Sequence, residues 1–514
     1  MNDDGVVEID TAGMTADDVL AVARGGARVE LTGRAVAEMA AARKRVDELA
    51  AAPVPAYGIS TGFGALATRH IDPELRERLQ RSLVRSHAAG MGEAMPREVV
   101  RALMLLRAKT LASGRTGARP EVARTLAALL NAGITPVVRE YGSLGCSGDL
   151  APLAHCALVL MGEGRATGPD GTEDDAAALL DRAGITPVPL AAKEGLALIN
   201  GTDGMLGMLI MAIADLRHLV RVADITAAMS VEALLGTDQV FLPELQALRP
   251  HPGIGDSAAN MLAVLAGSGI VASHRHGDTR VQDAYSLRCA PQVAGAVRDT
   301  LDHAALVAGR ELAAAVDNPV VLPDGRVSSN GNFHGAPVAY VLDFLAIAAA
   351  DCGSIAERRT DRLLDVSRSH GLPAFLADDP GVDSGLMIAQ YTQAALVSES
   401  KRLAVPASVD SIPSSAMQED HVSMGWSAAR KLRTGVDNLA RVLAVELVAA
   451  ARGLDLRAPL VPSPATRAVR DALRETVPGP GPDRFLAPDL AAAEAFVRSG
   501  AVVAAAEPVV GPLR

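Results

Sequence analysis

Three long stretches of the sequence carry apolar residues at helical spacing, and they constrain the fold more than any other feature. The first runs from Met205 to Leu235 and stops at Gly236; the other two are marked by Val341, Leu345, Ala348, Cys352 and Ile355, and by Val436, Leu439, Leu443 and Leu447. Helices of this length usually belong to bundles. Hydrophobic residues make up 49% of the chain but aromatic residues only 3%, so Ala, Leu and Val must build the core. The sequence therefore predicts a mainly α fold whose core is a bundle of long helices.

The chain before these stretches is richer in loops. Shorter helices are expected at 38–51, within 73–111 with a break between 90 and 96, and at 121–132. Residues 162–193 contain several turn signals and one short helix near 174–183, which indicates a surface excursion. We therefore expect an N-terminal domain over 1–203 and a long-helix domain with C-terminal helices over 204–514, joined in one integrated subunit.

Composition also narrows the function. The formal charge of -11 and the lack of a basic cluster give no reason to expect a nucleic-acid partner. The N-terminus begins Met-Asn-Asp-Asp, which is acidic and has no apolar run behind it, and this argues against a signal peptide. No continuous apolar run reaches the ~18 residues that span a bilayer. The four cysteines show no disulfide framework, so we expect a cytoplasmic protein with reduced thiols.

One loop stands out because small residues crowd into it. Residues 142–148 read Gly-Ser-Leu-Gly-Cys-Ser-Gly, and Asp149 with Pro152 then opens an apolar run. Asp near an N-cap and Pro in a first turn are signals of a helix start. The pattern predicts a tight loop that carries Cys146, Ser147 and Gly148 to the positive end of a helix. A nucleophile elbow, Gly-x-Ser-x-Gly, does not fit because Asp149 stands where the second glycine is required.

Other polar, glycine-rich segments recur between the predicted helices. They are 56–64, 200–203, 280–290, 330–335 and 413–425. Binding and catalytic residues are carried disproportionately on loops held by a rigid scaffold. Two of the five tyrosines, Tyr57 and Tyr285, lie in these segments, which indicates where acid–base chemistry could occur.

The segment Gly142-Ser-Leu-Gly-Cys-Ser-Gly-Asp-Leu-Ala-Pro-Leu-Ala-His155 resembles the signature of the histidine and phenylalanine ammonia-lyases. The resemblance extends from the Tyr57 loop to the Glu419 loop and is greatest to the bacterial, actinobacterial-type, histidine-specific members. It implies an ammonia-lyase/fumarase-like bundle whose N-terminal part carries a 4-methylidene-imidazole-5-one (MIO) group, with no external cofactor. Most family members have Ala where this chain has Cys146, a side chain that would stay at the periphery of the ring.

Ring formation explains the residue types in this segment. The Gly148 nitrogen would attack the Cys146 carbonyl, an approach that a residue without Cβ makes cheaply. Ser147 would then lose its hydroxyl as water and leave an electrophilic methylidene. A helix N-terminus behind the ring would stabilise negative charge as a nucleophile adds.

The resemblance also assigns expected roles to residues on the other loops. Tyr57 would transfer a proton near the substrate amine, and Tyr285 would be the base that takes the β-proton. Arg288 would hold the substrate carboxylate as a planar fork. Asn200, Gln282 and Phe333 would contact or line the prosthetic group and the substrate.

His87 and Glu419 bear on which amino acid is bound. In the family pattern, Ser-His-Ala-Ala-Gly at 86–90 would place His87 against a substrate imidazole, and Glu419 would face the same ring. A carboxylate suits a ring that can carry positive charge, so the pair favours histidine over phenylalanine or tyrosine. His274 and His276 could suggest a metal site, but we expect no metal, because no further ligands follow at matching spacing.

The implied reaction is a non-hydrolytic elimination that converts L-histidine to trans-urocanate and ammonia, the first step of histidine degradation. Addition of either the substrate amine or its imidazole to the electrophile is compatible with the sequence. A homotetramer whose active sites take residues from three chains is expected. The alternatives are a related aromatic amino acid ammonia-lyase or aminomutase, and a helical scaffold without catalytic activity.

Overall fold

The structure is a computed structural model of the chain and describes residues 5–52 and 56–514. The chain forms two compact units that are each discontinuous in sequence. Unit 1 comprises 1–211, 305–342 and 406–430, and unit 2 comprises 212–304, 343–405 and 431–514. The predicted continuous domains 1–203 and 204–514 differ from these units, because two later segments return to unit 1.

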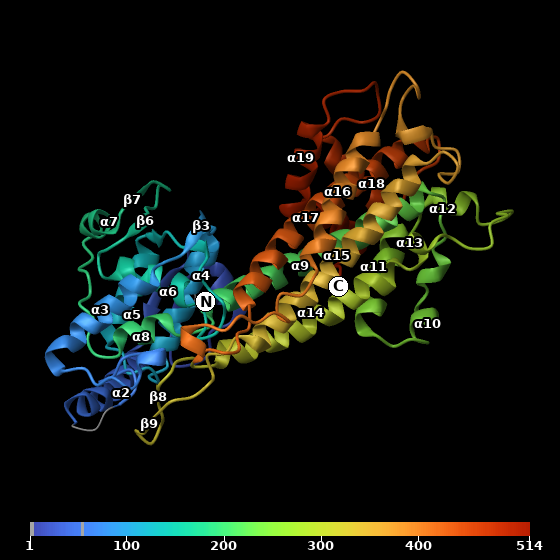
Figure 1. Cartoon of the computed structure of the whole chain (residues 1–514). Coiled ribbons are helices and arrows are strands. Elements are labelled where there is room, and N and C mark those ends of the chain that lie inside the picture. The colour runs from blue at the N-terminus through green and yellow to red at the C-terminus, as the bar shows by residue number, and fades with distance from the viewer. Residues whose placement is uncertain (1–4, 53–55) are drawn as a thin grey trace. The chain divides into compact units, whose positions relative to one another are not determined.

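Unit 1 is built mainly from short helices, with a few short strands between them (Figure 1). Its helices are α1 (Ala16–Ala23), α2 (Gly33–Ala51), α3 (Arg76–His87), α4 (Arg97–Ala112), α5 (Pro120–Asn131), α6 (Leu150–Leu160), α7 (Ala176–Arg182) and α8 (Glu194–Ile199). Helix α4 is at the centre, since all but its first two residues are buried. The break predicted between α3 and α4 is confirmed, and the surface excursion over 162–193 contains two short strands and α7.

The strands of unit 1 are short and pair locally. Strands β1 (Val6–Ile9) and β2 (Arg28–Leu31) are parallel, whereas β3 (Met91–Ala94) pairs antiparallel with β5 (Arg139–Tyr141). A three-stranded antiparallel sheet has the order β4 (Thr135–Pro136), β6 (Arg165–Thr167), β7 (Glu173–Asp175), and β8 (Val320–Val321) pairs with β9 (Val327–Ser328). The β3–β5 pair matters most for function, because β5 leads directly into the Gly142–Gly148 loop.

Unit 2 contains most of the long helices. They are α9 (Asp203–Ala233), α14 (Ala290–Ala313), α15 (Ala336–Leu364), α16 (Met387–Leu403) and α17 (Gly425–Leu456). Helix α16 belongs to unit 2 as a whole. The other four belong to it in part: α9 from residue 212, α14 up to residue 304, α15 from residue 343 and α17 from residue 431. Within unit 2 these helices lie side by side as a bundle (Figure 1). The predicted mainly α fold with long helices is confirmed.

Buried polar groups join the helices of this bundle. The Glu446 carboxylate of α17 pairs with Arg359 of α15, with 2.5 Å between Oε1 and Nε, and accepts hydrogen bonds from Thr226 and Ser230 of α9 at 2.8 Å. Asp224 of α9 pairs in the same way with Arg298 of α14 at 2.6 Å. Such pairs are costly to break once buried, because one charge would lose its partner.

Helix α15 alone among the described helices is long and apolar enough to cross a membrane by length and composition, but 61% of the tested window is buried inside the protein. Core helices of soluble proteins pass the same test. Asp343 and Asp351 interrupt the apolar residues of α15, so its sequence contains no continuous apolar run of spanning length.

Shorter helices complete unit 2. They are α10 (Pro243–Gln246), α11 (Pro252–Leu265), α12 (Gly269–Ser273), α13 (Tyr285–Arg288), α18 (Pro464–Arg474), α19 (Ala487–Arg498) and α20 (Ala501–Val510). Helix α13 carries two of the predicted site residues at its ends.

Candidate active site

The tripeptide Cys146–Gly148 lies in unit 1, in the loop between β5 and α6. Cys146 is almost fully buried. Gly148 has a φ of +76°, and a Cβ at this position would lie 2.0 Å from the Gly201 carbonyl oxygen. Since no side chain fits there, the chain requires glycine at this position. The backbone of Gly148 thus lies directly against the backbone of Gly201.

Asp149 occupies the N-cap position of α6, as predicted, but its side chain caps a different helix. Its Oδ2 accepts hydrogen bonds from the Gly204 and Met205 amides in the first turn of α9, both at 2.9 Å. Oδ1 accepts from the Ser143 hydroxyl at 2.9 Å, and no side-chain hydrogen bond caps α6 itself. Complete burial raises the pKa of Asp149 to about 7 against the effect of these donors.

A cavity of about 630 Å³ opens beside the tripeptide. It is lined by several of the predicted site residues, namely Tyr57, His87, Ser147, Asn200 and Glu419. These residues come from five separate segments of the sequence. Within unit 1 the structure brings these five residues together around one cavity.

His87 ends α3, and its ring orientation is fixed by the backbone. Its Nδ1 lies 2.9 Å from the Leu83 carbonyl oxygen and 3.1 Å from the Ser86 hydroxyl. A carbonyl oxygen can only accept, so Nδ1 carries the proton and Nε2 is left for another partner. Burial lowers the pKa of His87 below its ordinary value, although the backbone contact and Glu419 act in the opposite direction. A neutral His87 therefore presents Nε2 as an acceptor.

Glu419 lies on a tight turn that brings it back to Ser414. The Ser414 hydroxyl donates to Oε2 at 3.0 Å, and the Ser147 hydroxyl lies 3.5 Å from Oε1. The turn between them holds Ser415, Ala416 and Met417 at positive φ. Burial, together with the Glu419 charge and a hydrogen bond to it, raises the pKa of Cys146 to about 12, so the thiol is protonated.

Tyr57 and Asn200 face the same cavity. The Tyr57 hydroxyl accepts a long hydrogen bond from the Gly64 amide at 3.5 Å, and burial raises its pKa, with Glu419 and Asp317 adding to the effect. The Asn200 Nδ2 donates to the Asn318 carbonyl at 3.0 Å. Its Oδ1 is buried, and within the described residues it has no hydrogen-bond partner, so it is available to a bound molecule.

The other predicted residues do not line this cavity. Phe333 is half-buried in the loop between β9 and α15. Gln282, Tyr285 and Arg288 belong to unit 2. The Tyr285 side chain is 71% exposed. The guanidinium carbon of Arg288 lies 4.6 Å from the centre of the Tyr285 ring.

The sequence did not identify several residues that shape the site. They are Ser143, Gly201, Ser414 and the lining residues Leu150, Leu196, Ile199 and Arg69. Leu150, Ile199 and Gly201 border predicted site residues, so proximity in sequence was an available signal for them. Ser414 lies within the predicted loop 413–425, but its contact with Glu419 depends on how the turn folds.

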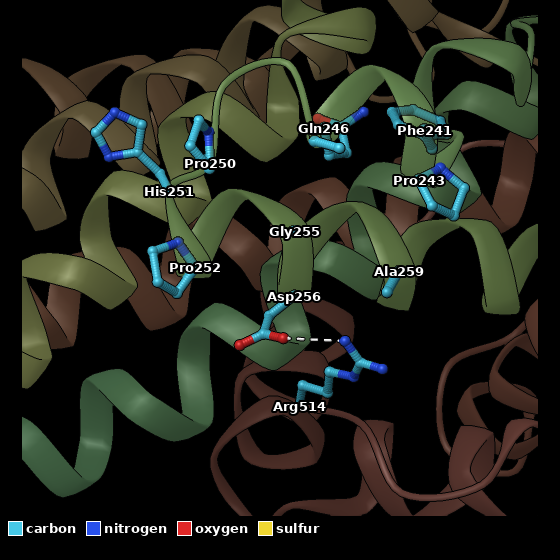
Figure 2. A pocket seen from close by; sticks show the side chains of 11 residues that line it. Phe241, Pro243, Gln246, Pro250, His251, Pro252, Gly255, Asp256, Ala259 and Arg514 are labelled. Atoms are coloured by element: carbon cyan, nitrogen blue, oxygen red, sulfur yellow. Dashed lines mark hydrogen bonds and ion pairs between the residues drawn. The ribbon is translucent and has the colours of Figure 1, made fainter.

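A second hollow, of about 490 Å³, lies in unit 2 and contains none of the predicted residues. Figure 2 shows prolines and Phe241 along one rim, with the Asp256–Arg514 ion pair at 3.2 Å on the other.

Within residues 5–52 and 56–514, no group of three or more His, Cys, Asp or Glu side chains is placed to hold a metal ion. His274 lies in a turn after α12, with its Nδ1 3.3 Å from Asp278 Oδ2.

Comparison with known proteins relates this chain to one family. The aromatic amino acid lyase family model matches residues 14–475. The chain is 75% identical over 508 residues to the histidine ammonia-lyase of Streptomyces avermitilis, with 99% of each chain covered. Among solved structures it is similar to tyrosine aminomutase from Streptomyces globisporus (TM-score 0.92, 38% identity, 99% and 100% covered) and to histidine ammonia-lyase from Trypanosoma cruzi (TM-score 0.90, 40% identity, 98% and 96% covered).

Proposed function

The chain belongs to the aromatic amino acid lyase family, and from this premise we propose that it eliminates ammonia from L-histidine to give trans-urocanate. The observation that carries the choice of substrate is the presence of His87 and Glu419 in one cavity with Ser147. A phenylalanine ring offers no donor to the two acceptors His87 Nε2 and Glu419, and a tyrosine hydroxyl has one proton for both of them; an acceptor left without a donor in a site closed to water is costly.

The tripeptide fits the MIO group that the family resemblance implies. Gly148 is the nitrogen donor that ring closure needs, and its contact with Gly201 leaves no room for another residue. Neither the Gly148 N–H nor the Cys146 carbonyl takes part in a hydrogen bond within the described part of the chain, so both reacting groups are free. When formed, the group would supply an electrophilic methylidene carbon; the residues around it would bind, orient and move protons.

The residues of the cavity would recognise the imidazole ring of the substrate. His87 presents Nε2 as an acceptor because Nδ1 donates to the Leu83 carbonyl. Glu419, steadied by Ser414, would accept from the other side of the ring. Tyr57 is held neutral by its raised pKa, so its hydroxyl can donate a proton or a hydrogen bond near the substrate amine. Asn200 would contact the prosthetic group or the substrate carboxylate.

The remaining groups would come from unit 2 segments. Tyr285 would take the β-proton of the substrate, and Arg288 would hold its carboxylate. Gln282 would lie near the ring, and Phe333 of unit 1 would line it. We propose that the enzyme is a homotetramer whose active sites combine residues of three chains, as the family resemblance implies; the exposure of Tyr285 is consistent with a residue that acts at a shared site. The four free cysteines are typical of a reducing compartment, so a cytoplasmic location is proposed.

The test is an assay of the purified protein with L-histidine, in which the ultraviolet absorbance of urocanate is followed. L-Tyrosine and L-phenylalanine are assayed in parallel, because the fold is shared with a tyrosine aminomutase. Formation of urocanate is expected. Activity on tyrosine or phenylalanine alone would refute the choice of substrate.

A further inference from the structure

Ser423 makes a buried contact with the loop that carries the tripeptide. Its hydroxyl donates to the Gly145 carbonyl at 2.8 Å and accepts from the Gly425 amide at 3.2 Å. Ser423 is 2% exposed, so water does not compete for this bond. The accepted bond from Gly425 fixes the direction of the hydroxyl, and its proton therefore points at Gly145.

The next residue holds the neighbouring carbonyl. The Met424 amide donates to the Leu144 carbonyl at 2.9 Å. Met424 has a φ of +54°, a conformation that non-glycine residues rarely adopt and that persists only where surrounding contacts hold it. Two successive carbonyls of the loop, Leu144 and Gly145, are thus held by two successive residues of one segment.

The packing around this contact is tight. A Cβ on Gly145 would lie 2.1 Å from the Ser423 hydroxyl oxygen, and one on Gly335 would lie 2.9 Å from it. The Gly335 amide also approaches the Gly145 carbonyl, at 3.5 Å. Three segments therefore meet at the residue before Cys146.

The other end of the tripeptide is held independently. The Asp149 amide donates to the Gly201 carbonyl at 2.7 Å, and the Asp149 carboxylate is bound to α9. Cys146 to Gly148 thus form a short span between two fixed points. Holding two reacting groups close together in this way is what makes an intramolecular reaction fast.

We propose that Ser423 is a positioning residue for ring closure of Cys146–Gly148. The inference rests on the proposed prosthetic group. In the reaction, a bond forms between the Gly148 nitrogen and the Cys146 carbonyl carbon, and the amide proton of Gly148 passes to the carbonyl oxygen. That oxygen leaves as water with the Ser147 amide proton, and the Ser147 hydroxyl leaves as a second water with its Cα proton. Ser423 touches none of these atoms and acts by holding the peptide that precedes them.

The test is the intact mass of the full-length chain at intervals after synthesis, since ring closure removes two water molecules. Wild type is expected to lose both. Ser423→Ala is expected to fold, as judged by circular dichroism and thermal unfolding. Its ring closure should be about tenfold slower than in wild type, because a tenfold change corresponds to the loss of one hydrogen bond. Ser411→Ala is the matched control, because Ser411 lies on the same segment and its hydroxyl accepts only from the Val422 amide; it should close like wild type.

The outcomes separate the two proposals. A wild-type chain that keeps both waters would refute the prosthetic group and, with it, the role of Ser423. If the wild-type chain forms the ring and the Ser423→Ala chain forms it equally fast, the role of Ser423 is refuted but the prosthetic group is not. Should Ser423→Ala fail to fold, Ser423→Cys retains a weaker donor of similar size, and closure at the wild-type rate in that variant would likewise refute the role.

Discussion

The Asp149 carboxylate accepts the Met205 amide at 2.9 Å, and so the residue that follows the tripeptide caps α9 rather than its own helix α6. Gly204 donates to the same oxygen at the same distance. Anchored in the first turn of a long helix, the C-terminal end of the loop gains a fixed position that a cap on the short α6 could not supply. Stability and site geometry are therefore coupled at Asp149.

Replacing Asp149 by Ala should lower the free energy of unfolding by about 1–3 kcal/mol, because the Gly204 and Met205 amides would be buried without acceptors. Denaturant unfolding measures the change. Asp175 is the control, since it also occupies an N-cap position, that of α7, without a capping hydrogen bond; Asp175→Ala should change stability by less than about 1 kcal/mol, the contribution of its exposed ion pair with Arg165. Equal losses in the two variants would contradict the prediction.

The stability contributed by Asp149 should also depend on pH. Burial raises its pKa from 3.8 to about 7 in the folded chain, so between these values the folded chain keeps a proton that the unfolded chain releases. The free energy of unfolding should therefore fall as pH rises through this window, with a slope on the order of 1 kcal/mol per pH unit. Asp149→Asn cannot titrate and should lack this component. If the difference in free energy of unfolding between wild type and Asp149→Asn stays constant from pH 5 to pH 8, titration of Asp149 does not contribute to stability.

The Arg359–Glu446 pair should contribute to both the bundle and α13. Both side chains are almost fully buried, and the Arg359 guanidinium also lies 3.3 Å from the Ser286 carbonyl oxygen of α13. Glu446→Gln should destabilise the chain by roughly 3–5 kcal/mol, because a buried arginine loses its countercharge. The exposed pair Arg28–Glu30 is the control, and Glu30→Gln should cost at most about 1 kcal/mol. If Glu446→Gln and Glu30→Gln lower the thermal unfolding temperature equally, burial does not strengthen the contribution of the Arg359–Glu446 pair.

The local features of this chain were predictable because their signals are local. The apolar spacing from Met205 to Leu235 predicted α9, which runs from Asp203 to Ala233. The glycines around Cys146-Ser147 predicted the loop before α6. Helical periodicity and turn chemistry act over a few residues, and a sequence displays them directly.

The partners of these elements were not predictable from one sequence. Asp149 bonds with Met205 across 56 positions, and Ser423 bonds with Gly145 across 278. Such contacts depend on which distant segments of the chain return to the same unit. The spacing of apolar residues along the sequence does not contain this information. The division into discontinuous units has the same origin, because the segments 305–342 and 406–430 join unit 1 through contacts far from them in sequence.

Glu419 should determine the preference for histidine. Glu419→Gln keeps the size and the contact with Ser414 but removes the charge that would face the imidazole. A hydrogen bond to a charged group contributes about 1.5–3 kcal/mol, so the KM for L-histidine should rise roughly 10- to 100-fold. Asp420→Asn is the control, because this neighbouring carboxylate does not line the cavity. An unchanged KM in Glu419→Gln would remove Glu419 from substrate recognition.

Tyr57 should contribute through its hydroxyl rather than through its ring. Tyr57→Phe retains the half-buried ring, and the hydroxyl accepts only a long hydrogen bond from Gly64, so the loop should keep its fold. Loss of a group that transfers a proton typically lowers kcat by about 10²- to 10⁴-fold. Since burial and nearby carboxylates raise the pKa of Tyr57, the phenol is the form that acts, and activity that depends on it should decline only at alkaline pH. Tyr391, 60% exposed on α16, is the control, and Tyr391→Phe should leave kcat unchanged. A Tyr57→Phe enzyme with wild-type kcat would assign proton transfer to another residue of the site.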